Sequence, residues 1–313
     1  MKEIVAFTMN PTIDKSARID HVVAERKLYC TDPYFEPGGG GINVARAIRK
    51  LGGRSRLLYT AGGYTGNRLE ELLAEEGLNQ QRISIAGMTR ESLAVLEEAT
   101  GLQYRFGMPG PNVQPDEWQQ CLKEVSVLNP YPDYLVVSGS LPPGVPSDAY
   151  AQIARTAKGH DGTRVVVDVS GDALKEALSE GVYLIKPNIR EFSELLGKDV
   201  KEELEIEAEA MEMVQKGWCE VLVISLGSAG ALLVSAEGSE HIRPPTVPII
   251  SKVGAGDSMV AGLVLRLAQG APLREAVYFG VAAGAAAVMT PGSELCRRED
   301  AERLYAKIMT KTK

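Results

Sequence analysis

Several features that would place this 313-residue chain in a class at once are scarce or missing. Its four cysteines (Cys30, Cys121, Cys219 and Cys296) stand far apart, with no C-x-x-C pair and no histidine at zinc-finger spacing. Such spacing is typical of reduced cytosolic thiols. No run reaches the roughly 18 apolar residues of a membrane span, and the N-terminal MKEIVAFTMN has no signal-peptide core. We therefore expect a cytoplasmic protein with no membrane partner.

Positive charge is also in short supply. The chain has 34 basic and 41 acidic residues, a net charge of −7, and no basic block that would neutralise phosphates along a nucleic acid. We therefore expect no nucleic-acid partner. With 44% hydrophobic and 24% charged residues, the composition is that of an ordinary globular protein.

Short apolar runs rich in β-branched residues alternate with helix-like segments such as 148–158 and 201–215. This alternation predicts βαβ units, and hence an α/β fold with a mostly parallel central sheet flanked by helices. Several runs end in Gly, Ser, Asp or Asn, as expected where ligands gather at the carboxyl ends of strands. The runs are IVAFTM (4–9), YLVVSGS (134–140), RVVVDVS (164–170), YLIKPN (183–188) and VLVISLG (221–227).

Two regions break this rhythm and predict a small separate β-layer. Residues 12–36 alternate weakly, and residues from about 89 to 107 indicate a hairpin around Thr100-Gly101. The layer would be a lid or an association surface inserted into a single domain spanning residues 1–313.

The stretch VGAGDSMVAG (253–262) puts one carboxylate behind a turn with almost no side chains. The backbone amides of Gly254, Ala255 and Gly256 would open a helix, whose N-terminus attracts anions. Asp257 is either a helix cap or a base that takes a proton from a hydroxyl beside a bound phosphate. Neither familiar nucleotide signature is present: G-x-G-x-x-G would need glycine at Met259, and no G-x-x-x-x-G-K-[ST] occurs.

Three further stretches carry candidate ligands. PGGGGINVARAI (37–48) joins four glycines to an amphipathic helix carrying Asn43, and is either a hydroxyl-binding turn or a flexible loop. KPNIRE (186–191) puts Asn188 and Glu191 on one helix face, as a cap or as partners of magnesium-bound water. SLGSAGALL (225–233) predicts strand, glycine turn and strand, able to hold ribose or phosphates. Asp168, at a strand end, is a cap or an indirect partner of magnesium.

The ordered set TMNPTID (8–14), PGGGGINVARAI, KPNIRE, SLGSAGA (225–231) and VGAGDSMVAG resembles the PfkB family of sugar kinases, which has a ribokinase-like fold. The similarity spans essentially the whole chain. Within the family, CTDPYFEPGGGGINVARAI (30–48), GLQYRFGMPG (101–110) and SGSLPPGV (138–145) are most similar to the minor bacterial type of ATP-dependent 6-phosphofructokinase.

The resemblance implies a Mg-ATP-dependent kinase acting on the 1-hydroxyl of fructose 6-phosphate, a step of glycolysis, with Asp257 as general base. The 254–256 amides would stabilise the transferring phosphoryl group, and Glu191 would act on magnesium through water. The implied sugar ligands are Asp14, Gly38, Gly39 and Asn43 for hydroxyls, and Lys27, Arg90, Ser140 and, more weakly, Arg105 for phosphate. The implied ATP ligands are Lys186, Asn188, Ser225, Gly227 and Gly230.

Substrate and assembly are less closely defined by the motifs. Related 1-phosphofructokinases and tagatose-6-phosphate kinases usually have lysine where this chain has Gly40, which favours fructose 6-phosphate over those two substrates. A sugar-phosphate or nucleotide sensor without turnover is the alternative from another class. The resemblance also implies a homodimer through the lid, and it leaves potassium binding by AAVMTPGSE (286–294) open.

Overall fold

The main sheet of the computed structural model, which describes residues 1–160 and 162–311, has nine strands in the order β13-β12-β11-β10-β9-β8-β1-β4-β5. All neighbouring pairs from β11 to β5 are parallel, and only β12 and β13 join in antiparallel fashion. The predicted mostly parallel sheet is thus confirmed. The strands are β1 (Ile4–Thr8), β4 (Arg56–Ala61), β5 (Asn79–Ser84), β8 (Tyr134–Ser138), β9 (Arg164–Asp168), β10 (Val182–Ile185), β11 (Cys219–Ser225), β12 (Ala231–Ser235) and β13 (Gly238–Ile242).

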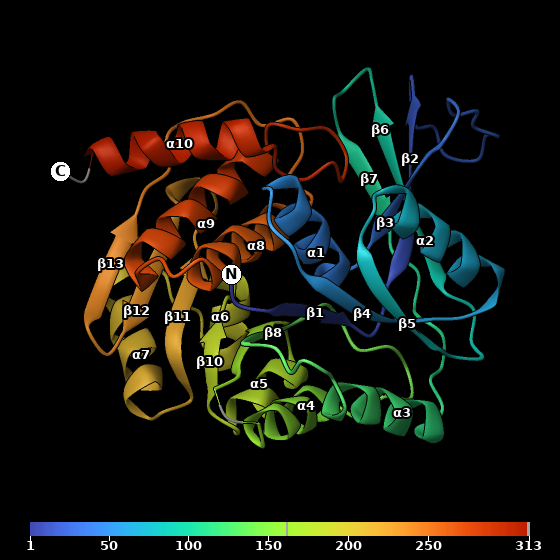
Figure 1. Cartoon of the computed structure of the whole chain (residues 1–313). Helices are drawn as coiled ribbons and strands as arrows, with labels where there is room; N and C mark the ends of the chain where they lie inside the picture. Colours follow the sequence, from blue (N-terminus) through green and yellow to red (C-terminus); the bar gives the residue numbers. More distant parts are fainter. Residues whose placement is uncertain (161, 312–313) are drawn as a thin grey trace.

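Helices cover both faces of this sheet (Figure 1). In β1, Ile4 and Ala6 point into one core, while Val5 and Phe7 point into the other, so the strand is apolar throughout. The first core is shared with α1 (Gly40–Lys50), α2 (Gly63–Glu75), α8 (Ala255–Ala268), α9 (Leu273–Ala287) and α10 (Arg298–Lys311). The second is shared with α3 (Pro115–Ser126), α4 (Ala149–Lys158), α5 (Asp172–Leu178), α6 (Ile189–Leu196) and α7 (Glu203–Gln215).

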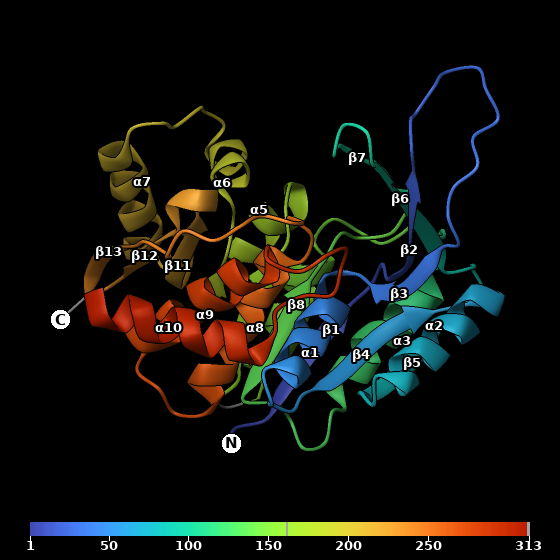
Figure 2. The ribbon, with the colours of Figure 1, turned by 90° about the horizontal axis from the view of Figure 1, so that it is seen from above.

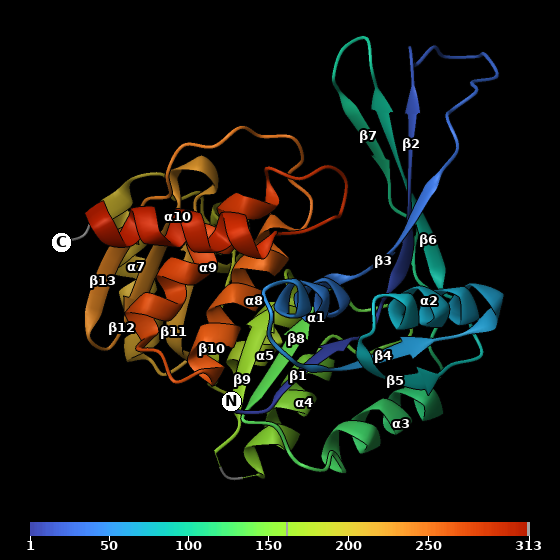
Figure 3. The ribbon, with the colours of Figure 1, turned by 45° about the horizontal axis from the view of Figure 1, so that its top comes forward.

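A second, four-stranded sheet projects from one end of the molecule (Figures 2 and 3). Its order is β3-β2-β6-β7, from β2 (Thr12–Ile19), β3 (Tyr34–Gly38), β6 (Arg90–Glu97) and β7 (Gln103–Phe106). The predicted β-layer and its hairpin are confirmed, although residues 20–33 form an exposed loop and not a strand. That the chain is one domain with an inserted lid stays a prediction.

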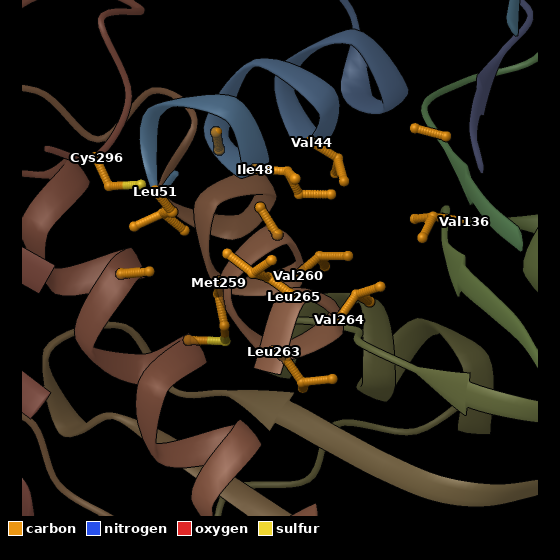
Figure 4. Close-up of a cluster of buried hydrophobic side chains, with 14 of the residues drawn as sticks. Val44, Ile48, Leu51, Val136, Met259, Val260, Leu263, Val264, Leu265 and Cys296 are labelled. Atoms are coloured by element: carbon orange, nitrogen blue, oxygen red, sulfur yellow. The ribbon is translucent and has the colours of Figure 1, made fainter. Parts of the chain in front are cut away.

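Helices α1 and α8 pack closely against each other beneath the lid. Val44 and Ile48 of α1, and Leu51 directly after it, lie with Val260 and Val264 of α8 in one buried cluster (Figure 4). The apolar positions predicted from the sequence are all in this core: Ile42, Ala45, Ile48 and Leu51. Among the described helices, none is long and apolar enough to cross a membrane.

This packing predicts graded losses of stability at Ile48, which is fully buried. Ile48→Val should lower the free energy of unfolding by about 0.5–1.5 kcal/mol and Ile48→Ala by about 2–5 kcal/mol, because a cavity remains. Urea unfolding measures both. Lys307→Ala, on the exposed side of α10, is the control and should change stability by less than about 0.5 kcal/mol. Equal stability of all three variants would contradict the packing described.

Candidate active site

The polar strand ends predicted from the sequence converge at one edge of the main sheet. β1 lies between β4 and β8, so the main-sheet strands that follow it along the chain continue first on one side of β1 (β4, β5) and then on the other (β8, β9). Where the strand order reverses in this way, a crevice opens at the carboxyl ends of the strands. Asn10 follows β1, Ser138 ends β8, Asp168 ends β9, Lys186 follows β10 and Ser225 ends β11.

The glycine turn before α8 borders this crevice. Gly254 has φ 72°, in the left-handed region, and a Cβ there would lie 2.2 Å from Cδ2 of Leu295. Backbone conformation and lack of space therefore both require glycine. A Cβ at Gly256 would lie 3.2 Å from the Lys186 Nζ, so the Lys186 ammonium lies close to the turn. The first amides of α8 are open to an anion beside this cation.

Asp257 lies in the first turn of α8 and is held by α1. The Asn43 Nδ2 donates a hydrogen bond of 2.8 Å to its Oδ2. Burial, and then the negative charge of Asp168, raise the pKa of Asp257 to about 6, while the Asn43 hydrogen bond and Lys186 oppose the rise. A carboxylate with a pKa near neutrality is suited to accept a proton.

Lys186 is buried between acidic groups. Its Nζ lies 3.1 Å from Oδ1 of Asp168, and 6% of the side chain is exposed. Burial opposes its charge, but Asp168, Asp257 and Glu191 together outweigh that effect and raise the pKa of Lys186. The residue therefore stays a cation at the centre of the crevice.

Asn188 and Glu191 form a reciprocal cap on α6. The Glu191 backbone N donates to the Asn188 Oδ1 at 2.9 Å, and the Asn188 backbone N donates to the Glu191 Oε2 at 2.8 Å. This is the capping box of an S/T-x-x-E type, with asparagine in the first position. The cap interpretation of the pair is confirmed, and a role toward magnesium stays a prediction.

A cavity of about 450 Å³ on this side of the crevice brings three of the predicted nucleotide ligands together: Lys186, Asn188 and Ser225. Asp168 and Glu191 both line it, yet no group of three or more His, Cys, Asp or Glu side chains in the described residues could hold a metal alone. This set fits Mg²⁺, which binds through one or two carboxylates, waters and substrate phosphates. The lining includes Ser140, Lys186, Asn188, Ser225, Gly256 and Asp257.

A cavity of about 480 Å³ lies under the lid and is lined by Asp14, Gly39, Asn43, Arg90, Arg105, Gly254 and Asp257. The Asp14 carboxylate packs against bare backbone, since a Cβ at Gly38 would lie 2.2 Å from its Oδ2. Burial raises the pKa of Asp14, although Arg90 and Arg105 oppose the rise. The cavity thus combines hydroxyl-binding groups with two guanidinium groups.

Gly254 and Asp257 line both cavities. A carboxylate with a raised pKa and an open helix N-terminus therefore stand where ligands in the two cavities would meet. Chemically, the arrangement can take a proton from a hydroxyl on one side while binding a phosphoryl group on the other.

Five predicted residues line neither cavity: Lys27, Gly38, Ala255, Gly227 and Gly230. Lys27 lies in the exposed 20–33 loop, its Nζ 5.1 Å from the centre of the Tyr29 ring, so the structure does not bring it to the cavity of its own chain. Gly227 and Gly230 belong to the turn beyond Ser225, around the short 3₁₀ helix Gly227–Ala229. Ser140 lies on the nucleotide side and accepts a hydrogen bond of 3.0 Å from the Asn10 Nδ2.

Some lining residues were missed by the sequence interpretation. Ser16 follows Asp14 at the period of a strand and faces the same side, which could have indicated it. Lys252 precedes the glycine turn by two residues, and Ser293 lies in the 286–294 loop. Lys15, which lies 2.9 Å from Glu91, and Ser92 also line this cavity and were missed.

Comparisons with known proteins agree with this geometry. The chain is 43% identical over 307 residues to the ATP-dependent 6-phosphofructokinase isozyme 2 of Escherichia coli K12, covering 98% of this chain and 99% of that protein. It is 31% identical over 306 residues to the 1-phosphofructokinase of Bacillus subtilis, covering 97% and 98%.

A crystal structure of the phosphofructokinase-2 from Escherichia coli in complex with potassium superposes with a TM-score of 0.94 at 42% identity, covering 99% of this chain and all of that one. The model of the pfkB family of carbohydrate kinases matches residues 5–300. The resemblance and the ribokinase-like fold predicted from the motifs are confirmed. The chain belongs to the pfkB family of carbohydrate kinases.

Proposed function

We propose that this protein transfers the γ-phosphoryl group of ATP to the 1-hydroxyl of fructose 6-phosphate, giving fructose 1,6-bisphosphate and ADP. The observation that carries the proposal is the position of Asp257 and Gly254, which line the sugar-side and the nucleotide-side cavities together. The 43% identity to a 6-phosphofructokinase over nearly the whole chain supports the same substrate.

In this proposal the sugar lies under the lid. Asp14, Asn43 and the Gly38-Gly39 backbone bind its hydroxyls. Arg90 and Arg105 bind the 6-phosphate, because a guanidinium fork matches the geometry of phosphate oxygens. Ser140 stays a candidate ligand of the sugar phosphate, although its side chain lines the nucleotide-side cavity. The 1-hydroxyl then faces Asp257.

Asp257 accepts the proton of the 1-hydroxyl as that oxygen forms its bond to the γ-phosphorus. The bond from the γ-phosphorus to the oxygen bridging to the β-phosphate breaks, and ADP departs with the electron pair of that bond. The amides of residues 254–256 stabilise charge on the phosphoryl oxygens, and the Lys186 ammonium neutralises it from beside the turn.

ATP would be held by Lys186, Asn188 and Ser225, with Gly227 and Gly230 at the outer edge. Magnesium would be held by Glu191 through water, with Asp168 beside it, and it would neutralise phosphate charge.

The proposal also includes a potassium site in the 286–294 loop. A potassium complex of the similar Escherichia coli enzyme supports it. The loop is tied to the irregular segment before the glycine turn, because Ile250 N donates to the Val288 carbonyl at 2.7 Å and Ser251 Oγ donates to the Gly292 carbonyl at 3.0 Å.

We also propose that two copies pair through their lids. Large apolar side chains are exposed there, and pairing would remove them from water. Lys27, which does not line the sugar-side cavity of its own chain, lies beside this surface. The exposed side chains are Tyr29, Tyr34, Leu102, Phe106 and Met108.

The cytoplasm stays the expected compartment.

Gly40 bears on the alternative substrates, tagatose 6-phosphate and fructose 1-phosphate. A Cβ there would lie 2.2 Å from the Ser138 Oγ and 2.7 Å from the Gly139 N, so lysine would require both to move. The wall is therefore built for glycine, which favours fructose 6-phosphate. A sensor without turnover is disfavoured because Asp257, the glycine turn and the Asn188–Glu191 pair are all in place.

Asp257→Asn should lower turnover about 10²–10⁴-fold with substrate KM values largely kept, since only the proton acceptor is lost. Its stability is the control. The folded-state pKa of about 6 lies above the ordinary 3.8, so ionisation costs stability as pH rises through that window. Asparagine removes that cost, and the variant should unfold at no lower urea concentration than the parent at pH 8. Near-normal turnover would contradict the assignment of the base.

The pH profile tests the same residue independently. In the parent, kcat/KM should fall below a pH of about 6, where Asp257 becomes protonated. Asp168→Asn should move this limb to lower pH, because the negative charge of Asp168 raises the pKa of Asp257. Asp20→Asn, in the exposed lid loop, should leave the limb unmoved. If the acidic limb of the Asp168→Asn profile stays at the same pH or moves to higher pH, the result would count against Asp257 as the titrating group.

Coupled ADP release with Mg-ATP on fructose 6-phosphate, tagatose 6-phosphate and fructose 1-phosphate tests the substrate. We expect the highest kcat/KM with fructose 6-phosphate. A preference for another sugar would keep the kinase chemistry and overturn the interpretation of Gly40. Binding without ADP release on any of the three would favour the sensor.

A further inference from the structure

Arg46 is a buried cation that the proposed reaction does not use. It lies on α1, one turn after Asn43, and only 2% of its side chain is exposed. Its Nε donates to both carboxylate oxygens of Glu76 at 2.8 and 3.0 Å, and its Nη2 lies 3.3 Å from the Oε1 of Glu36. Its Nη1 donates to the carbonyls of Pro37 at 3.0 Å and Ser293 at 3.2 Å. We call these five residues the Arg46 cluster.

Two members of the cluster, Glu36 and Ser293, are also bonded directly to each other. The second carboxylate oxygen of Glu36 accepts the Ser293 hydroxyl at 2.7 Å. Burial opposes the charge of Arg46, but Glu76 and Glu36 together raise its pKa. Every nitrogen of the guanidinium has a partner, so its orientation is fixed by three separate chain segments: residues 36–37, Glu76 and Ser293.

Two of those segments lead directly into the sugar-side cavity. The Pro37 carbonyl immediately precedes Gly38, whose backbone packs against the Asp14 carboxylate, and Gly39, which lines the cavity. Ser293 lines the same cavity and comes from a distant part of the sequence. Arg46 thus joins two segments that lead into the cavity lining with one side chain.

The Ser293 side also leads to the glycine turn. The neighbouring Gly292 carbonyl accepts the Ser251 hydroxyl at 3.0 Å, and Val253 N donates to that hydroxyl at 3.2 Å. Val253 directly precedes Gly254. Hydrogen bonds therefore join Arg46 to the segment that presents Asp257.

Apolar packing would not fix these segments. A glycine run has few side chains to pack and many backbone conformations to lose, and Gly39 has φ 113°. A buried ion cluster is seldom more stabilising than apolar residues of the same volume, but its hydrogen bonds have direction. Directional bonds to two carbonyls are what a glycine-rich cavity wall needs.

We propose that Arg46 is a positioning residue that fixes the glycine-rich segment after Pro37 and the segment around Ser293 relative to each other, and so sets the fit of the sugar phosphate in the sugar-side cavity. The identity of that sugar rests on the proposed function, whereas the wall-positioning role does not.

The test compares Arg46→Lys with Arg266→Lys. Lysine keeps the charge but cannot reach all three segments. Arg266 is the matched control, because it also makes a two-pronged bond to a glutamate, Glu302 at 3.0 and 2.9 Å, away from both cavities. We expect Arg46→Lys to raise the sugar KM at least tenfold, with the ATP KM within threefold. Arg266→Lys should change neither KM more than twofold.

Glu36→Gln is a second variant that keeps the test decisive if Arg46→Lys does not fold. Glutamine has the same shape as glutamate but lacks its charge. It should raise the sugar KM three- to tenfold. Amide hydrogen exchange in peptides covering 35–43 and 288–297 should accelerate in both variants and not in Arg266→Lys. A sugar KM within twofold of the parent and unchanged exchange in those peptides would overturn the proposal.

The sugar used is the one with the highest kcat/KM in the parent, so a wrong substrate assignment leaves the test intact. If the parent turns over none of the three, the proposed function fails. Calorimetric titration of the same sugar phosphates and the exchange rates then decide on Arg46 alone.

Discussion

The hydrogen bond between Asn43 and Asp257 is the interaction on which the site depends. The two residues are 214 positions apart in sequence, and they meet because α1 and α8 pack through a shared apolar core (Figure 4). Asn43 follows the four glycines of the sugar-side wall, and Asp257 follows the glycine turn. One bond of 2.8 Å therefore sets the position of the glycine-rich wall relative to the Asp257 carboxylate. It also lowers the pKa of a carboxyl that burial would otherwise raise further.

The charges of the crevice alternate, for a physical reason. In the proposed reaction Asp257 must stay ionised near a ligand that carries several negative charges, and like charges at short range disfavour ionisation. Lys186 interacts with both Asp168 and Asp257, and Arg90 and Arg105 line the sugar-side cavity. The cations are thus divided between the two cavities: Lys186 lies beside the glycine turn, and the two arginines lie where the proposed function puts the sugar phosphate.

Much of the site could be predicted because it depends on local sequence. Parallel strands that end in Asp168, Lys186 and Ser225 necessarily meet at one edge of the sheet, and the GAGD turn opens a helix. Arg46 could not be predicted in the same way. In VARAIRK it looks like an ordinary helical arginine, and its burial depends on Glu76, thirty residues away, and on Ser293. Lys27 was predicted from the resemblance alone, and its loop does not lie at the cavity of its own chain.

The two sheets have edges of opposite character. The outer strands of the main sheet, NQQRIS in β5 and GSEHI in β13, are polar, and His241 of β13 is bonded to Glu203 of α7. Polar, tethered edges resist pairing with strands of other molecules. The outer strands of the lid, YFEPG in β3 and QYRF in β7, expose Tyr34 and Phe106. The edges of the main sheet are therefore protected against pairing with other strands, whereas the edges of the lid leave apolar side chains in water that a second molecule could cover.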